Sequence, residues 1–133
     1  MKYLLDTNIC IYCIRKSPQK VFRRLQKQEV GDIGISAITF SELEFGVANS
    51  KNPDQNQTAL SELVSVLEVA SYTAEVAPIY GSIRAALHKK GQQIGPLDLL
   101  IAAHSLFLGT VLVTNNVREF NRVPGLQVEN WTT

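Results

Sequence analysis

Residues 95–116, GPLDLLIAAHSLFLGTVLVTNN, decide the fold class of this chain. Gly95-Pro96 and Gly109 bracket an apolar helix, because proline suits a first helical turn and glycine suits a helix end. Residues 110–114 then form an apolar run of strand length with no polar face. A strand of this kind is typical of a parallel sheet that helices cover on both sides.

The same alternation of apolar strands and helices runs through the whole chain. Strands are predicted at residues 2–5, 32–36, 68–71, 110–114 and 126–129. Helices are predicted at residues 9–15, 18–28, 39–47, 57–67, 73–90 and 96–109. Asn8 is predicted to cap the first helix, and residues 49–56 to form a polar loop. The pattern predicts an α/β fold, a three-layer α/β/α sandwich with a mainly parallel central sheet.

Length and composition set the broad class. A chain of 133 residues with 45% hydrophobic content and a net charge of +1 predicts one globular domain, residues 1–133. No apolar run is long enough to span a membrane, and residues 2–6 do not resemble a signal peptide. We therefore expect a cytoplasmic protein without a membrane partner.

Two further features each allow two interpretations. Cys10 and Cys13 have the spacing of a redox pair, but their Ile and Tyr neighbours favour buried, inert thiols. A basic stretch contains no acid and is either a solvated helix face or a surface that contacts a phosphate backbone. Its cations are Arg15, Lys16, Lys20, Arg23, Arg24 and Lys27.

Four carboxylates carry the functional argument: Asp6, Glu42, Asp98 and Glu119. Asp6 ends the first strand, and the other three fall in or near helices that follow strands or pack on them. An open α/β sheet binds its ligands at the carboxyl ends of its strands, so this edge is where most of these acids are expected to meet. Gathered carboxylates repel one another, and a hard cation such as Mg²⁺ removes that repulsion.

Each acid also has a purely structural interpretation. Glu42 fits a capping box with Thr39, and Asp98 lies in a first helical turn, where the helix dipole favours a carboxylate. Glu119 is close in sequence to two arginines, and Asp6 is able to cap the following helix. A non-catalytic binding module therefore remains an alternative. A receiver-like signalling domain and a redox protein are weaker alternatives, because the late lysine and the reactive cysteine environment are missing.

With these residues in place, the chain resembles the PIN-domain endoribonucleases and, among them, the VapC toxins of toxin–antitoxin pairs. The resemblance rests on four segments in order: residues 5–8 (LDTN), 38–43 (ITFSEL), 95–104 (GPLDLLIAAH) and the tail from Val113 to Trp131. It covers the chain from end to end.

The resemblance implies a metal-dependent ribonuclease that uses Mg²⁺, with Mn²⁺ as a substitute. Asp6, Glu42 and Asp98 match the acidic metal-site positions, and Thr7 matches a hydroxyl that supports the site. Many family members carry Asp where this chain has Asn116. Asn116 and Glu119 are therefore alternatives for the fourth position, and one Mg²⁺ is favoured over two.

The resemblance also implies partners. These are an RNA substrate, with initiator tRNA cut in its anticodon loop, a cognate VapB-like antitoxin, and a second copy of the chain in a homodimer or a larger toxin–antitoxin assembly. The RNA would be steered by the basic stretch, with Arg15, Lys20, Arg23, Arg24 and Lys27 as its contacts. The antitoxin is expected to pack on the amphipathic helices between residues 39 and 67.

Overall fold

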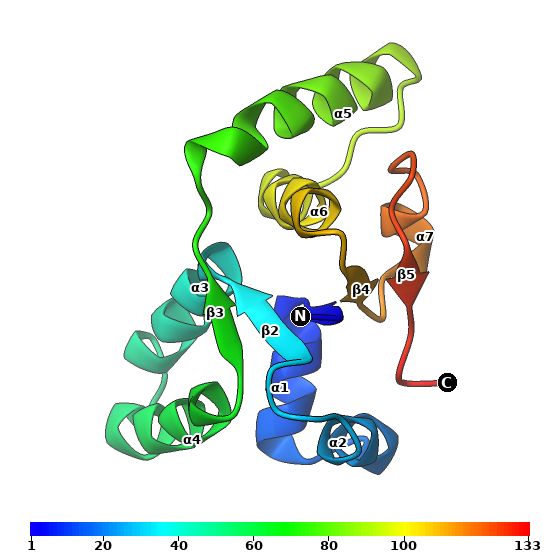
Figure 1. The fold of residues 1–133 in the computed structure, drawn as a ribbon. Helices are drawn as coiled ribbons and strands as arrows, with labels where there is room; N and C mark the ends of the chain where they lie inside the picture. Colours follow the sequence, from blue (N-terminus) through cyan, green and yellow to red (C-terminus); the bar gives the residue numbers. More distant parts are fainter.

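The computed structural model describes residues 1–133 and has a five-stranded sheet at its centre (Figure 1). All of its strand pairs are parallel, and the strand order is β3-β2-β1-β4-β5. The strands are β1 (Tyr3–Leu5), β2 (Ile33–Ser36), β3 (Glu68–Ala70), β4 (Val111–Val113) and β5 (Val128–Glu129). The chain order reverses at β1, where β2 lies on one side and β4 on the other, and such a reversal creates a ligand crevice at the carboxyl ends of the strands.

Helices cover both faces of this sheet, which confirms the predicted three-layer sandwich. Buried side chains of α1 (Thr7–Arg15), α2 (Gln19–Gln26), α3 (Ala37–Ala48) and α4 (Pro53–Ser65) form the core on one face. The other core receives the 3₁₀ turn η1 (Ala74–Val76) and the helices α5 (Ala77–Lys89), α6 (Pro96–Leu108) and α7 (Val117–Phe120). Figure 1 shows α1, α2 and α4 on the side of the sheet opposite α5, α6 and α7.

Successive residues of the central strands supply the two cores in turn. Tyr3 and Leu5 of β1 pack on the first core, whereas Leu4 packs on the second. Leu112 of β4 joins the second core and Val113 the first. Because side chains alternate across a strand and both faces are covered, the short apolar strands need no polar face.

Several helix boundaries differ from the sequence prediction for identifiable reasons. Asp6, not Asn8, caps α1, and its side chain accepts the backbone hydrogen of Ile9. Helix α4 starts at Pro53, since the fixed φ of proline suits the first helical position, where no backbone hydrogen is needed. The predicted loop over residues 49–56 therefore ends earlier than expected. The predicted helix over residues 73–90 is divided into η1 and α5.

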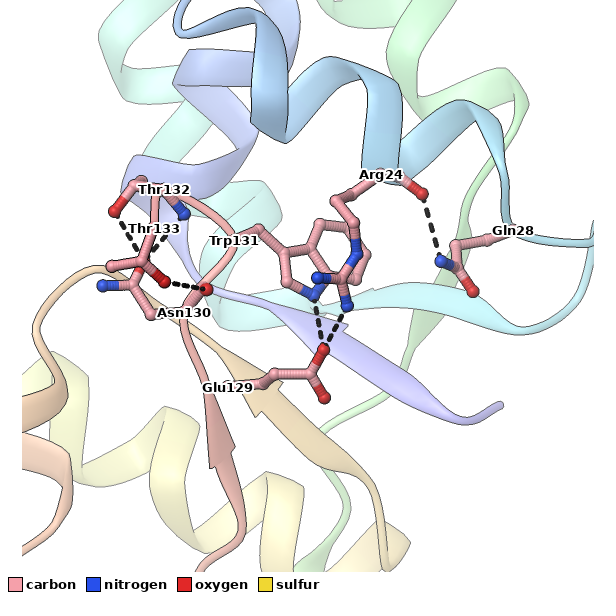
Figure 2. Close-up of polar contacts among 7 residues, drawn as sticks. All are labelled: Arg24, Gln28, Glu129, Asn130, Trp131, Thr132 and Thr133. Atoms are coloured by element: carbon pink, nitrogen blue, oxygen red, sulfur yellow. Dashed lines mark hydrogen bonds and ion pairs between the residues drawn. The ribbon is translucent and has the colours of Figure 1, made fainter.

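The C-terminal residues fold back onto α2 in an arrangement that we call the C-terminal clasp, made of Arg24, Glu129 and Trp131 (Figure 2). Trp131 is fully buried, and its Nε1 donates to Oε1 of Glu129 at 3.0 Å. The same carboxylate forms an ion pair with Arg24, whose guanidinium lies 5.1 Å from the centre of the indole ring. Trp131 also packs edge to face on Tyr3, with 5.3 Å between the centres of the two rings.

None of the helices combines the length and the apolar character that a membrane crossing requires. Cys10 and Cys13 are buried free thiols in the first core. Burial raises the pKa of Cys13 to about 12 and that of Cys10 well above its usual value. The structure therefore favours the inert interpretation of the two cysteines over a redox pair.

Candidate metal-binding site at the acidic edge

The structure brings the four predicted carboxylates to one edge of the sheet. Asp6 follows β1, Glu42 lies on α3 after β2, Asp98 lies in the first turn of α6, and Glu119 lies on α7 after β4. Their charges act on one another, since Glu42 raises the pKa of Asp6 and the other three acids raise that of Asp98. We call these four residues the acidic edge.

Asp6 is the most buried member of the acidic edge, with 5% of its surface exposed. Its Oδ1 accepts the Ile9 backbone hydrogen at 2.9 Å. Burial raises the pKa of Asp6 above 3.8, and the nearby Thr114 side chain and the Ile9 backbone hydrogen oppose the rise. Asp6 therefore caps α1 with one oxygen and keeps further acceptor capacity for a ligand.

Glu42 does not cap a helix, contrary to one interpretation of the sequence. Helix α3 starts at Ala37, and Ser36 is its cap, with Oγ accepting the Ile38 backbone hydrogen at 3.0 Å. Thr39 lies inside the helix, so the proposed capping box does not form. Glu42 instead receives the hydroxyl of Thr7, from Oγ1 to Oε1 at 2.9 Å, which joins α1 to α3 at the acidic edge.

Asp98 and Glu119 form the other half of the acidic edge. Burial, followed by the charge of Glu119, raises the pKa of Asp98 from 3.8 to about 6. Glu119 accepts the backbone hydrogen of Gly95 at 2.8 Å and a hydrogen bond from the Asn116 side-chain amide. It forms no ion pair with a neighbouring arginine, because the one ion pair of the structure joins Arg24 and Glu129.

The donor set of the acidic edge suits a hard divalent cation. Its atoms are carboxylate oxygens, no cation of the chain pairs with them, and burial and mutual repulsion raise the pKa of Asp6 and of Asp98. No group of three Asp, Glu, His or Cys side chains is placed to hold a metal ion by itself. Mg²⁺ fits such an open arrangement, because it keeps several waters and binds through one or two carboxylates.

Two supporting contacts of the acidic edge were not predicted from the sequence. Thr114, which follows β4, accepts the Asn116 backbone hydrogen at 2.9 Å, and its side chain lowers the pKa of Asp6, which follows β1. The Gly95 backbone hydrogen holds Glu119. The position of Thr114 directly after a predicted strand indicates that it lies at this edge. The Gly95 contact is not predictable in this way, because every residue except proline has a backbone hydrogen.

A buried hydrogen bond ties together the two helices that carry Glu42 and Asp98. Nδ1 of His104, on α6, lies 2.8 Å from Oγ of Ser36, the cap of α3, although the two residues are 68 positions apart. His104 is fully buried, and burial lowers its pKa. His104 thus bonds to the cap of α3 and is not one of the residues of the acidic edge.

The predicted RNA-contacting cations lie in different surroundings. Arg15 lines a groove of about 330 Å³ between α1, α3 and α4 that also includes Thr7 and Glu42. Lys20, Arg23 and Lys27 are exposed on or just after α2. Arg24 differs from them, because its guanidinium is held by Glu129 and Trp131 in the C-terminal clasp (Figure 2).

Comparison with known proteins defines the class first. The PIN domain family model matches residues 3–126, which include all four members of the acidic edge. The chain is 44% identical over 132 residues to "Ribonuclease VapC2" of Rickettsia felis, with 98% of each protein covered. It is 41% identical to the "tRNA(fMet)-specific endonuclease VapC" of Shigella flexneri, with 99% of each covered.

A solved structure agrees with these relatives. The crystal structure of VapBC2 from Rickettsia felis, bound to a DNA fragment from its promoter, contains a chain that matches with a TM-score of 0.91 and 43% identity. The match covers 98% of this chain and 99% of the other. The chain therefore belongs to the PIN domain family and, within it, to the VapC group.

Proposed function

We propose that this protein is a Mg²⁺-dependent endoribonuclease and the toxin of a VapBC toxin–antitoxin pair. The observation that carries the proposal is the acidic edge, where four carboxylates from four separate segments meet without a cation of the chain. Carboxylates that repel one another and have no cation of the chain are stabilised by an external cation, and a hard divalent ion supplies one. The names of the VapC relatives support RNA as the substrate.

Asp6 and Asp98 would hold the ion, directly or through water, and Glu42 would contact it through a bound water; Mn²⁺ is expected to substitute for Mg²⁺. When bound, the ion would neutralise the carboxylates and stabilise the charge that develops on the scissile phosphate. Asp6 is suited to this role because its hydrogen bond to the first turn of α1 fixes its direction. Asp98 is suited because α6 holds it rigidly at its first turn.

Glu42 and Glu119 would act on water at the acidic edge. Thr7 donates to one oxygen of Glu42 at 2.9 Å, which leaves the other free to orient the attacking water and accept its proton. Glu119 is already bonded to Gly95 and Asn116. We therefore assign Glu119 to holding waters around the ion, and Asn116 to orienting Glu119 as a neutral residue.

We infer that the substrate is initiator tRNA, cut in its anticodon loop. The Shigella flexneri relative, 41% identical over nearly the whole chain, is named a tRNA(fMet)-specific endonuclease. Arg15, Lys20, Arg23 and Lys27 would contact the phosphate backbone outside the reaction centre. Arg24 would contribute less than these four, because Glu129 neutralises it.

A cognate VapB-like antitoxin would inhibit the enzyme by covering its groove. The related structure from Rickettsia felis is a VapBC complex. The groove between α1, α3 and α4 has an apolar lining that includes Ile11, Ile14 and Leu60, and it leads to Glu42. An amphipathic segment laid in this groove would block the acidic edge. We also expect a toxin homodimer within the complex, in the cytoplasm.

The decisive experiment incubates the purified protein with initiator tRNA and with elongator tRNAs, in Mg²⁺ and in EDTA, followed by mapping of the new ends. We expect one cut in the anticodon loop of initiator tRNA with Mg²⁺ and none with EDTA. Asp6→Asn and Asp98→Asn should each lower kcat by at least about a hundredfold. The matched control is Asp54→Asn, a first-turn acid of α4 outside the acidic edge. Cleavage that survives EDTA, or that Asp54→Asn removes equally, would contradict the proposal.

A further inference from the structure

A second cavity lies directly beside the acidic edge, between α5 and α6. Its volume is about 300 Å³, at the lower end of the range of ligand pockets. Its lining is apolar at Leu87, Ile94 and Leu99 and polar at Arg84, His88 and Gln93. No acidic side chain lines it, so its electrostatic character is opposite to that of the acidic edge.

The polar side chains of this cavity form two hydrogen-bonded pairs among themselves. Arg84 donates from Nη1 to Oη of Tyr80 at 3.0 Å, and its guanidinium lies 5.9 Å from the centre of that ring. Gln93 Nε2 lies 2.6 Å from Nδ1 of His88. These contacts cluster a planar aromatic ring, a guanidinium, an amide and an imidazole around an apolar floor.

The segment 93–96 belongs to both the cavity and the acidic edge, because Gln93, Ile94 and Pro96 line the cavity and Gly95 contacts Glu119. Its backbone is held from the far side, because Arg122 donates to the Gln93 carbonyl at 3.0 Å and Gly95 donates to Glu119 at 2.8 Å. Pro96 lines the cavity, two residues before Asp98. The cavity is therefore lined by Pro96 and Leu99, the residues that flank Leu97 and Asp98 in the sequence.

We propose that this cavity binds one unstacked base of the RNA strand, next to the phosphate that is cut. The inference rests on the proposed ribonuclease function and adds a specificity subsite to it. Single-stranded RNA is recognised by splaying out a base, stacking it on an aromatic ring or an arginine plane, and hydrogen-bonding its edge. Tyr80 and Arg84 supply the stacking surface, and His88 and Gln93 supply the groups that contact the base edge.

The test uses the full chain and a set of anticodon stem-loop RNAs, each with one loop base replaced by an abasic site. Loss of one stacked base should raise KM by roughly tenfold to a hundredfold at a single position for the wild-type protein. In the variant Arg84→Met with Gln93→Ala, the KM for intact RNA should rise similarly, and the abasic site should add nothing. Both residues are exposed, so the variant is expected to keep its fold.

Lys89→Met is the matched control, because Lys89 ends the same helix but does not line the cavity. It should leave the penalty of the abasic site intact. If the penalties of the abasic site and of the cavity variant add at every position, the cavity does not hold a base, and the ribonuclease proposal is untouched. If the wild-type protein cuts no RNA in Mg²⁺, the proposed function fails, and this subsite fails with it.

Discussion

The C-terminal clasp and the acidic edge both contain carboxylates near the ends of strands. They differ in whether a cation of the chain pairs with those carboxylates. Glu129 has a cation of the chain, Arg24, and a donor in the buried indole of Trp131 (Figure 2). The acidic edge has only neutral donors: the Thr7 hydroxyl, the Asn116 amide and the backbone hydrogens of Ile9 and Gly95.

The clasp is therefore a contact that stabilises the fold, whereas the acidic edge is a candidate site for a cation. A carboxylate paired within the chain gains nothing further from an added ion. Carboxylates that repel one another, and whose pKa values burial raises, gain a great deal when a cation arrives. Removing the clasp should therefore cost stability without affecting chemistry, and altering the acidic edge should do the reverse.

The largest effect is expected from Trp131→Ala, which empties the centre of the clasp. Truncation of a fully buried tryptophan costs about 3–5 kcal/mol of unfolding free energy, and chemical denaturation followed by circular dichroism measures it. Trp131→Phe should recover most of the loss. Cleavage by the folded fraction should keep its kcat, and a kcat that falls with stability would erase the distinction between the two regions.

Next in size is Asn116→Lys, which gives the acidic edge a cation of its own. Its amide already contacts Glu119, so an ammonium there should raise the Tm in EDTA, abolish stabilisation by Mg²⁺ and slow cleavage at least about a hundredfold. Asn115→Lys is the control, because the Asn115 side chain donates to Tyr12 and not to an acid. Equal effects from both substitutions would mean that bulk charge, not the edge, is responsible.

A smaller effect concerns the metal-free protein and pH. The pKa of Asp98 is about 6 when folded, against 3.8 for the ordinary value, so the stability that its proton contributes is complete below 3.8 and is lost as pH rises through 6. With solvent screening at this partly exposed group, the loss is roughly 1–2 kcal/mol. Urea unfolding in EDTA from pH 4 to 7 should show it in the wild-type protein but not in Asp98→Asn. A loss of the same size in both proteins would assign it to another group.

The smallest effect compares two neighbouring arginines of α2. Arg24→Met should cost about 0.5–1 kcal/mol of stability, because the ion pair with Glu129 is partly exposed. Arg23→Met should leave stability unchanged but lower the salt dependence of RNA binding by about one phosphate contact. Fluorescence anisotropy of labelled RNA across a salt series distinguishes them. An unchanged slope for Arg23→Met would remove it from the RNA surface.

The sequence was sufficient for the positions of the acids but not for their contacts. The positions of Asp6 and Asp98 were predictable from their local sequence. Asp6 directly follows an apolar strand, and Asp98 lies in the first turn of a helix that begins with proline. In a parallel sheet, both contexts favour a position at the carboxyl edge of the strands. The interpretation of Glu42 as part of a capping box with Thr39 was wrong, because Thr39 lies inside α3 and Ser36 is the cap. The contact of Ser36 with His104 joins residues 68 positions apart, and no local pattern indicates such a pairing.

The buried indole of the clasp has a practical consequence. Trp131 is the sole tryptophan of the chain, its side chain is fully buried, and it contacts Arg24 and Glu129 (Figure 2). Intrinsic emission therefore reports on one place, and a red shift signals that the tail has left α2. Tryptophan fluorescence therefore reports the state of the C-terminal clasp without a label, and it should stay unchanged when only the acidic edge is altered.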